Sequence, residues 1–202
     1  MILQSLKPRF KQPIALAWPA LFACAAMAAC SKTPATPDVY IDALVGGGSA
    51  CSTFGSSQEF LKIGSTTNPN EPSTVPDGTG TVAVECTVSP GGDGFDLTLG
   101  AGGPNGGRVT INGHVTTKGG TVRATFANNN YGAFQADMCT LTYEFNRNPV
   151  PSNQAISAGE IFGHIECPGA VDQGGTQNAD GTAVACDASA DFLFSNCAGG
   201  GN

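Results

Sequence analysis

The sequence is poor in charge, histidine and tryptophan. Charged residues make up 12% of the 202 residues, about half the usual share, and there are two histidines and one tryptophan. The apolar run at 14–27 is shorter than the about 20 residues that a membrane-spanning helix needs. A Walker loop, a His-Glu-x-x-His motif and a Gly-x-Ser-x-Gly elbow are also missing. Few residues therefore remain that could carry acid–base chemistry.

The first thirty residues have the pattern of an export signal. Three basic residues precede the apolar run, and small residues lead to Cys30. The segment Met27-Ala28-Ala29-Cys30 resembles a bacterial lipobox, with Met in place of the usual Leu. This resemblance implies cleavage before Cys30 and a lipid on its sulfur. Two alternatives are a second box ending at Cys24 and an ordinary secretory signal that happens to contain cysteines.

A lipid on Cys30 predicts where the protein is located. Each buried methylene contributes about 0.8 kcal/mol, so two or three acyl chains anchor a protein firmly. Ser31, the residue after the anchor, favours the outer membrane over the inner one. We therefore expect a cell-envelope, outer-membrane lipoprotein attached through its N-terminal lipid, on a face that the sequence leaves open.

The charge balance excludes one class of partner. Loss of Lys7, Arg9 and Lys11 with the signal would leave six of the nine basic residues against 16 acidic ones, a formal charge of −10. Nucleic acids are bound by neutralising phosphates with Lys and Arg, so no nucleic-acid partner is expected. The sequence identifies no particular protein or glycan partner and no cofactor.

Six cysteines remain after Cys24 and Cys30 are set aside, and an even number in an exported chain predicts disulfides. They are Cys51, Cys86, Cys139, Cys167, Cys186 and Cys197. Zinc binding is the weaker interpretation because no two of them are close in sequence. Three disulfides allow 15 pairings. A hairpin geometry favours Cys167 with Cys186, and Cys139 with Cys167 is the competitor; the other pairings stay open.

Apolar and polar residues alternate in short segments separated by Gly- and Pro-rich turns. Phe95, Leu97 and Leu99, for example, alternate with Asp96 and Thr98. About eight strands are predicted, at 60–63, 81–88, 95–99, 109–116, 122–126, 140–145, 161–167 and 190–194. This pattern predicts an all-β fold: a single antiparallel, disulfide-linked β-sandwich or jelly-roll-like domain.

Three parts of the chain follow from these patterns. We expect a lipoprotein signal peptide at 1–29, a flexible Pro- and Gly-containing tether at 30–48 and the β-sandwich domain at 49–202. Residues 39–41 are the one stretch of the tether that could dock as a short strand. The aromatic residues expected near the surface, Tyr40, Tyr131, Phe134 and Phe162, are few for a sugar-binding module.

The two histidines offer little chemistry. His114 is expected on a polar strand face, exposed to solvent and without a partner that would orient it. His164 shares a strand face with Glu166, and Glu144 could lie beside it across a hairpin. A histidine next to carboxylates could move protons, although such pairs are also ordinary on exposed sheet faces.

A weak calcium candidate lies near the C-terminus. Asn178, Asp180 and Asp187 have part of the spacing of a calcium-binding loop, with Asp172 nearby. The pattern departs from an EF-hand at its first and last positions. A disulfide-framed Asp-Gly turn explains the same residues, so the sequence predicts no metal site.

The C-terminal third carries a family resemblance. The segment 161–168, ending in Cys167-Pro168, is followed by 186–197, which begins and ends with cysteine. With the earlier segment 94–99, these resemble a group of envelope lipoproteins of myxobacteria for which no activity is established. The resemblance implies an envelope lipoprotein with a cysteine-linked β domain, and it transfers no catalytic residue.

The sequence thus favours a non-catalytic envelope lipoprotein, a binding or structural β domain. The alternative is a secreted hydrolase or lyase that uses His164 with Glu144 or Glu166. A cleft that holds His164 and a carboxylate within hydrogen-bond distance would favour the enzyme.

Overall fold

The computed structural model describes residues 35–68 and 71–199, which are nearly all β-structure. Residues 1–34 fall outside this part, so the predictions for the signal peptide and for Cys30 concern residues that the structure does not describe. Among the described residues, no helix has the length and apolar character needed to cross a membrane.

The sheet is antiparallel and runs in the order β2-β1-β15-β14-β10-β9-β8-β7-β6. Its strands are β1 (Asp38–Val45), β2 (Gln58–Ile63), β6 (Ala83–Gly91), β7 (Gly94–Gly102), β8 (Arg108–Val115), β9 (Gly120–Asn128), β10 (Gly132–Thr142), β14 (Glu160–Asp172) and β15 (Ala185–Ser195). Short strands β5 (Val75–Pro76) and β13 (Ile156–Ser157) extend it. Two small separate pairs are β3 (Ser65–Asn68) with β4 (Glu71–Ser73) and β11 (Glu144–Phe145) with β12 (Asn148–Pro149).

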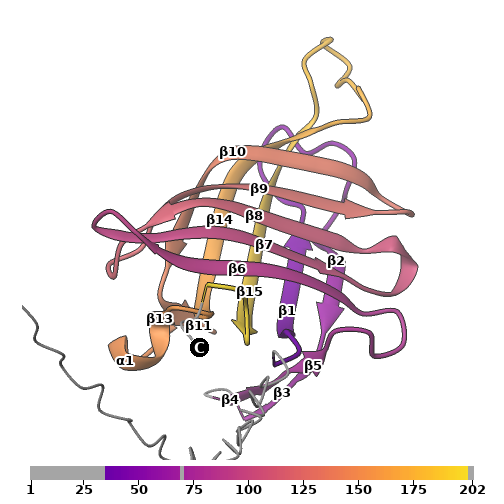
Figure 1. The fold of residues 1–202 in the computed structure, drawn as a ribbon. Helices are drawn as coiled ribbons and strands as arrows, with labels where there is room; N and C mark the ends of the chain where they lie inside the picture. The colour runs from indigo at the N-terminus through magenta and orange to yellow at the C-terminus, as the bar shows by residue number, and fades with distance from the viewer. Residues whose placement is uncertain (1–34, 69–70, 200–202) are drawn as a thin grey trace, which may run out of the picture. The chain divides into compact units, whose positions relative to one another are not determined.

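One curled sheet therefore forms the body of the protein (Figure 1). Strands β6–β10 form the front layer, and β14, β15, β1 and β2 run crosswise behind them. Two helical turns, η1 (Pro104–Gly106) and α1 (Ser152–Ala155), lie in connections. The all-β, antiparallel prediction is confirmed, whereas about eight strands was too few: the described residues form fifteen. From β6 to β15 the strands follow one another in the sheet in chain order, and β1 lies beside β15, the last strand.

The core lies between the two layers and is made by alternate residues of each strand. In β15, Cys186, Ala188, Ala190, Phe192 and Phe194 are buried, while the residues between them are at least partly exposed. This period of two is the alternation that the sequence shows. The other face of the back layer is therefore free to carry polar groups.

The predicted tether is wrong for residues 38–45. They form β1, an inner strand paired with β2 on one side and β15 on the other. Val39, Ile41, Ala43 and Val45 are fully buried. Two prolines before it and three glycines after it had suggested a linker, but the apolar alternation between them forms a strand that holds the sheet together.

Three disulfides are present, as predicted, but the favoured pairing was wrong. The pairs are Cys51–Cys186, Cys86–Cys197 and the competitor, Cys139–Cys167. Strand β14 continues past Cys167 through a bulge, so Cys186 lies opposite Ala170. Cys167 instead lies beside Cys139 of β10, with a Cα–Cα distance of 4.2 Å.

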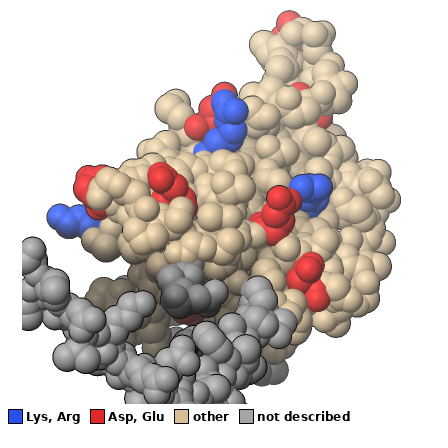
Figure 2. All heavy atoms as spheres, viewed as in Figure 1, with Lys and Arg blue, Asp and Glu red and all other residues tan. Residues whose placement is uncertain are grey.

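The front face carries few charges. Figure 2 shows scattered red and blue side chains on a largely uncharged surface, with opposite charges next to each other in several places. Arg123 of β9 and Asp137 of β10 form an ion pair in this layer, with Nε and Oδ1 2.8 Å apart. The front face thus shows no broad patch of one charge sign.

Candidate functional site on the outer face of the back layer

The outer face of the back layer is divided into an apolar and a polar part. The apolar part is a small cluster under β11, β12 and α1, made of Tyr40, Phe145, Val150, Ala155 and Phe162. Tyr40 and Phe162 are 2% and 7% exposed, so the surface role expected for them was wrong. Phe134 is also buried, and Tyr131, at 36% exposed, is the one aromatic of the expected four at the surface.

His164 lies in the polar part, next to this cluster. Strand pairing places it directly opposite Asp191 of β15 and Thr142 of β10. Its Nδ1 is 2.9 Å from Asp191 Oδ1, and both side chains are mostly buried, at 18% and 22% exposed. Asp191 therefore orients the ring, as a carboxylate orients a histidine in many acid–base sites.

Neither of the two carboxylates predicted to partner His164 forms a hydrogen bond with it. Glu166 Oε1 is 3.7 Å from Nε2, beyond hydrogen-bond distance. Glu144 accepts a hydrogen bond from Thr142 Oγ1 at 3.0 Å. The prediction of a nearby carboxylate was right in kind, but the residue that bonds His164 is Asp191, which sequence reasoning missed.

The charges around His164 favour its protonated form. Burial of the imidazole lowers the pKa of His164, but the hydrogen bond and the charge of Asp191 raise it. Glu166 and Glu144 add smaller effects in the same direction. Together they outweigh burial, so the pKa of His164 is raised above its ordinary value.

Two hollows open on this face. One, of about 350 Å³, is lined by Glu144, Asn146, Arg147, His164, Glu166, Ser189 and Asp191. The other, of about 330 Å³, is lined by Leu44, Gly46, Ser57, Glu166, Cys167, Pro168, Asp187, Ala188 and Ser189. Glu166 and Ser189 line both. We call the two hollows together the acidic groove, because four carboxylates and one guanidinium line it.

The polar row continues beyond Asp191. Asp42 of β1 lies opposite Asp191, and Lys62 of β2 lies opposite Asp42. The Nζ of Lys62 is 2.6 Å from Asp42 Oδ2. An ammonium group thus already binds a carboxylate of this face, in the way that a cation in the groove could bind Glu166 or Asp191.

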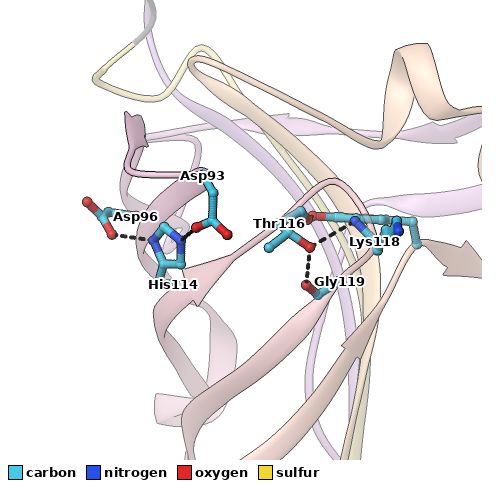
Figure 3. A network of polar contacts seen from close by, with 7 residues as sticks. Asp93, Asp96, His114, Thr116, Lys118 and Gly119 are labelled. Carbon is cyan, nitrogen blue, oxygen red and sulfur yellow. Dashed lines mark hydrogen bonds and ion pairs between the residues drawn. The ribbon is translucent and has the colours of Figure 1, made fainter.

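His114 has partners that the sequence did not suggest. Its Nδ1 is 2.9 Å from Asp96 Oδ1, and its Nε2 is 3.1 Å from Asp93 Oδ1 (Figure 3). The side chain is 41% exposed, so the expected exposure was right and the expected isolation was wrong. Hydrogen bonds that the carboxylates of Asp96 and Asp93 accept from the ring raise the pKa of His114. With both ring nitrogens bonded, this histidine joins the β6–β7 turn to β8 and offers no open nitrogen.

Two of the three calcium candidates, Asn178 and Asp180, are loop residues, and the third, Asp187, lies on β15. Asn178 donates hydrogen bonds within the β14–β15 loop, including one to Thr182 Oγ1 at 3.1 Å, and Asp180 Oδ1 accepts from the backbone and hydroxyl of Thr182. Asp187 Oδ1 accepts from Gly169 N at 3.1 Å, on the strands themselves. Within residues 35–68 and 71–199, no three His, Cys, Asp or Glu side chains are grouped to hold a metal ion.

Comparisons of this chain with protein-family models, curated proteins and solved structures find no match. Its function must therefore be argued from the groove and from the sequence.

Proposed function

We propose that this chain is an envelope lipoprotein, held at the outer membrane by a lipid on Cys30. The export signal and the lipobox-like residues 27–30 support this. Three disulfides support it too, because they persist in oxidising compartments outside the cytoplasm. In this proposal the two layers of the curled sheet act as a sandwich-like body carried on the anchor.

The function of that body is to bind a cationic ligand in the acidic groove. The observation that carries this proposal is the gathering of Glu144, Glu166, Asp187 and Asp191 in two adjoining hollows. Among the described residues that line them, two are basic, Arg147 and His164. A concave surface lined by one sign of charge concentrates ions of the opposite sign. The front face, by contrast, carries scattered charges of both signs (Figure 2).

Titration calorimetry with spermidine, a linear triamine, tests the binding site. Glu166 lines both hollows, so Glu166→Gln should weaken spermidine binding about two- to fivefold, the effect of losing one exposed ion pair. Glu85→Gln, on β6 in the other layer, is the matched control and should leave binding unchanged. Equal binding by both variants and the unchanged protein would remove the groove as the site.

A second candidate is a hydrolase or lyase that uses His164 as general base. The favouring observation is that His164 lies in a hollow with its Nδ1 held by Asp191, while its Nε2 makes no hydrogen bond among the described residues. Ester, phosphodiester and glycoside probes test this candidate. Turnover that is lost in both His164→Gln and Asp191→Asn would replace the binding proposal with the enzyme.

The anchor needs its own test. Cys30→Ala should release the protein from the membrane fraction, whereas Cys24→Ala should not, because the second box is not the proposed cleavage site. Unchanged membrane association of the Cys30→Ala protein would refute the lipid anchor while leaving the groove untouched.

A further inference from the structure

Strand β6 ends the sheet, yet other parts of the chain cover its outer edge. The N–H of Val84 donates to Asp77 Oδ1 at 2.7 Å. The N–H of Ala198 donates to Cys86 O at 3.0 Å, and that of Val88 donates to Ala198 O at 2.9 Å. Val84, Cys86 and Val88, three alternate residues of β6, therefore each make a backbone hydrogen bond on the side away from β7.

The covering continues toward the end of the strand. Gly159 donates its N–H to Val88 O at 2.9 Å, and Cys197 donates to Gly159 O at 2.9 Å. Pro90, the next outward-facing position, has no N–H to offer. Uncovered edge strands are templates for pairing with another chain, and natural proteins block them. The segment Cys197–Gly199, which we call the guard segment, has this blocking role.

The guard segment fits closely and is held by one covalent link. Gly199 has φ +94°, and a Cβ there would be 2.6 Å from Val88 O, so a larger residue could not approach β6 in this way. The disulfide Cys86–Cys197 joins the segment to the centre of the strand. Besides this disulfide, the two hydrogen bonds of Ala198 are its direct bonds to the β6 backbone.

We propose that the Cys86–Cys197 disulfide keeps the protein monomeric by holding the guard segment on β6. When a dithiol reduces this bond, the dithiol is oxidised to its own disulfide and Cys86 and Cys197 each take up a proton as thiols. The guard segment then leaves the edge. The outer edge of β6 then pairs with β6 of a second copy of this chain, whose backbone replaces Asp77 at the N–H of Val84 and Gly159 at the C=O of Val88.

The sequence of β6 suits such a two-fold pairing. An antiparallel pair centred on Cys86 places Val84 opposite Val88 of the other copy, and these outward-facing positions supply the ladder of N–H and C=O groups. The same register places Glu85 opposite Thr87, so the one charged residue of β6 does not face itself. One patch meets its own copy, as a two-fold dimer requires.

The other edge of the sheet is not equivalent. On β2, Phe60 O accepts a hydrogen bond from the buried Asn128 Nδ2 at 2.9 Å, and no disulfide secures this contact directly. Reduction of Cys86–Cys197 therefore uncovers the edge at β6 and leaves the edge at β2 covered. For this reason we take the partner strand to be β6 of a second copy.

Sedimentation equilibrium of full chains that carry Cys30→Ala tests the proposal. The pair Cys86→Ala/Cys197→Ala should double the apparent mass, while the matched control pair Cys139→Ala/Cys167→Ala should remain a monomer at the same concentration. A monomeric, folded Cys86→Ala/Cys197→Ala protein would overturn the proposal, and so would equal association of the control.

Two further variants cover the case in which the double variant does not fold. A chain that ends at Cys197 keeps the disulfide but loses both Ala198 hydrogen bonds, and should also dimerise. In Cys197→Ala alone, Cys86 lies at the centre of the predicted pair. Mild oxidation should then give a Cys86–Cys86 linked dimer on a non-reducing gel. Monomers in both experiments would refute the inference.

Discussion

Each disulfide, kept alone in a chain whose other four of these six cysteines are alanine, should stabilise the fold by a different amount. In the chain-entropy description, a closed loop of 28 residues, as for Cys139–Cys167, corresponds to about 3.6 kcal/mol. A loop of 135 residues, as for Cys51–Cys186, corresponds to about 5 kcal/mol. A variant that keeps only Cys51–Cys186 should therefore have a free energy of unfolding about 1.4 kcal/mol higher than one that keeps only Cys139–Cys167.

Urea denaturation measures this difference. Both pairs are buried, at 9% exposed or less, so loss of side-chain volume adds a similar amount to each variant and leaves the difference visible. The slope of unfolding free energy against urea must stay the same in both variants, because a change of slope would indicate an altered denatured or native state. If the variant that keeps only Cys139–Cys167 is the more stable of the two, loop closure is not the main contribution of these disulfides.

Three further predictions concern single side chains. Asp191→Asn should lower the pKa of His164 in a nuclear magnetic resonance titration, because the negative charge of the carboxylate beside Nδ1 is lost. An unchanged pKa would contradict the contact. Phe145→Ala should lower the free energy of unfolding by about 3 kcal/mol in urea, since the ring is 2% exposed; a loss below about 1 kcal/mol would show that the apolar cluster is dispensable. The pKa of His114 is raised in the folded state, so its contacts with Asp96 and Asp93 should stabilise the fold fully below the unfolded pKa of about 6.5. This stabilisation should be lost as the pH rises through the folded pKa. Asp96→Asn should flatten that part of the profile of stability against pH.

The sequence predicted strand positions well and strand register poorly. Each of the eight predicted segments overlaps an observed strand, because alternation of apolar and polar residues is a local property. Register depends on bulges and on partners far along the chain. Placing Cys167 opposite Cys186 puts His164 opposite Ser189. In the structure, the pairing is shifted by two residues, so that His164 lies opposite Asp191.

One error of register thus explains two misses, the disulfide and the partner of His164. A shift of two residues keeps every side chain on its correct face, so the burial pattern gave no warning. The bulge between Cys167 and Ala170, which carries β14 past the cysteine, is the feature that the sequence did not reveal. His114 was missed for a similar reason, since Asp93 and Asp96 reach it from a neighbouring hairpin.

The prediction of a flexible tether was wrong at residues 38–45 for a different reason. Proline and glycine mark both ends of 38–45, and such composition is typical of linkers. The strand between them is stabilised by its neighbours β2 and β15, which come from distant parts of the chain. Local composition cannot report partners that lie about 150 residues away along the chain, as Phe194 does from Val39.

Binding at the acidic groove should also depend on pH. Protonation of His164 adds a positive charge beside Asp191 and Glu166, which opposes a cationic ligand. Spermidine binding should therefore tighten as the pH rises through the pKa of His164, and His164→Gln should remove this dependence.

The most direct test of the account is a spermidine titration of the isotope-labelled protein followed by amide chemical shifts. Saturable shifts are predicted for residues around Glu166 on β14 and around Ser189 and Asp191 on β15, with little change on β6–β9. Shifts that do not saturate, or that cluster on the front layer, would contradict a cation site in the groove.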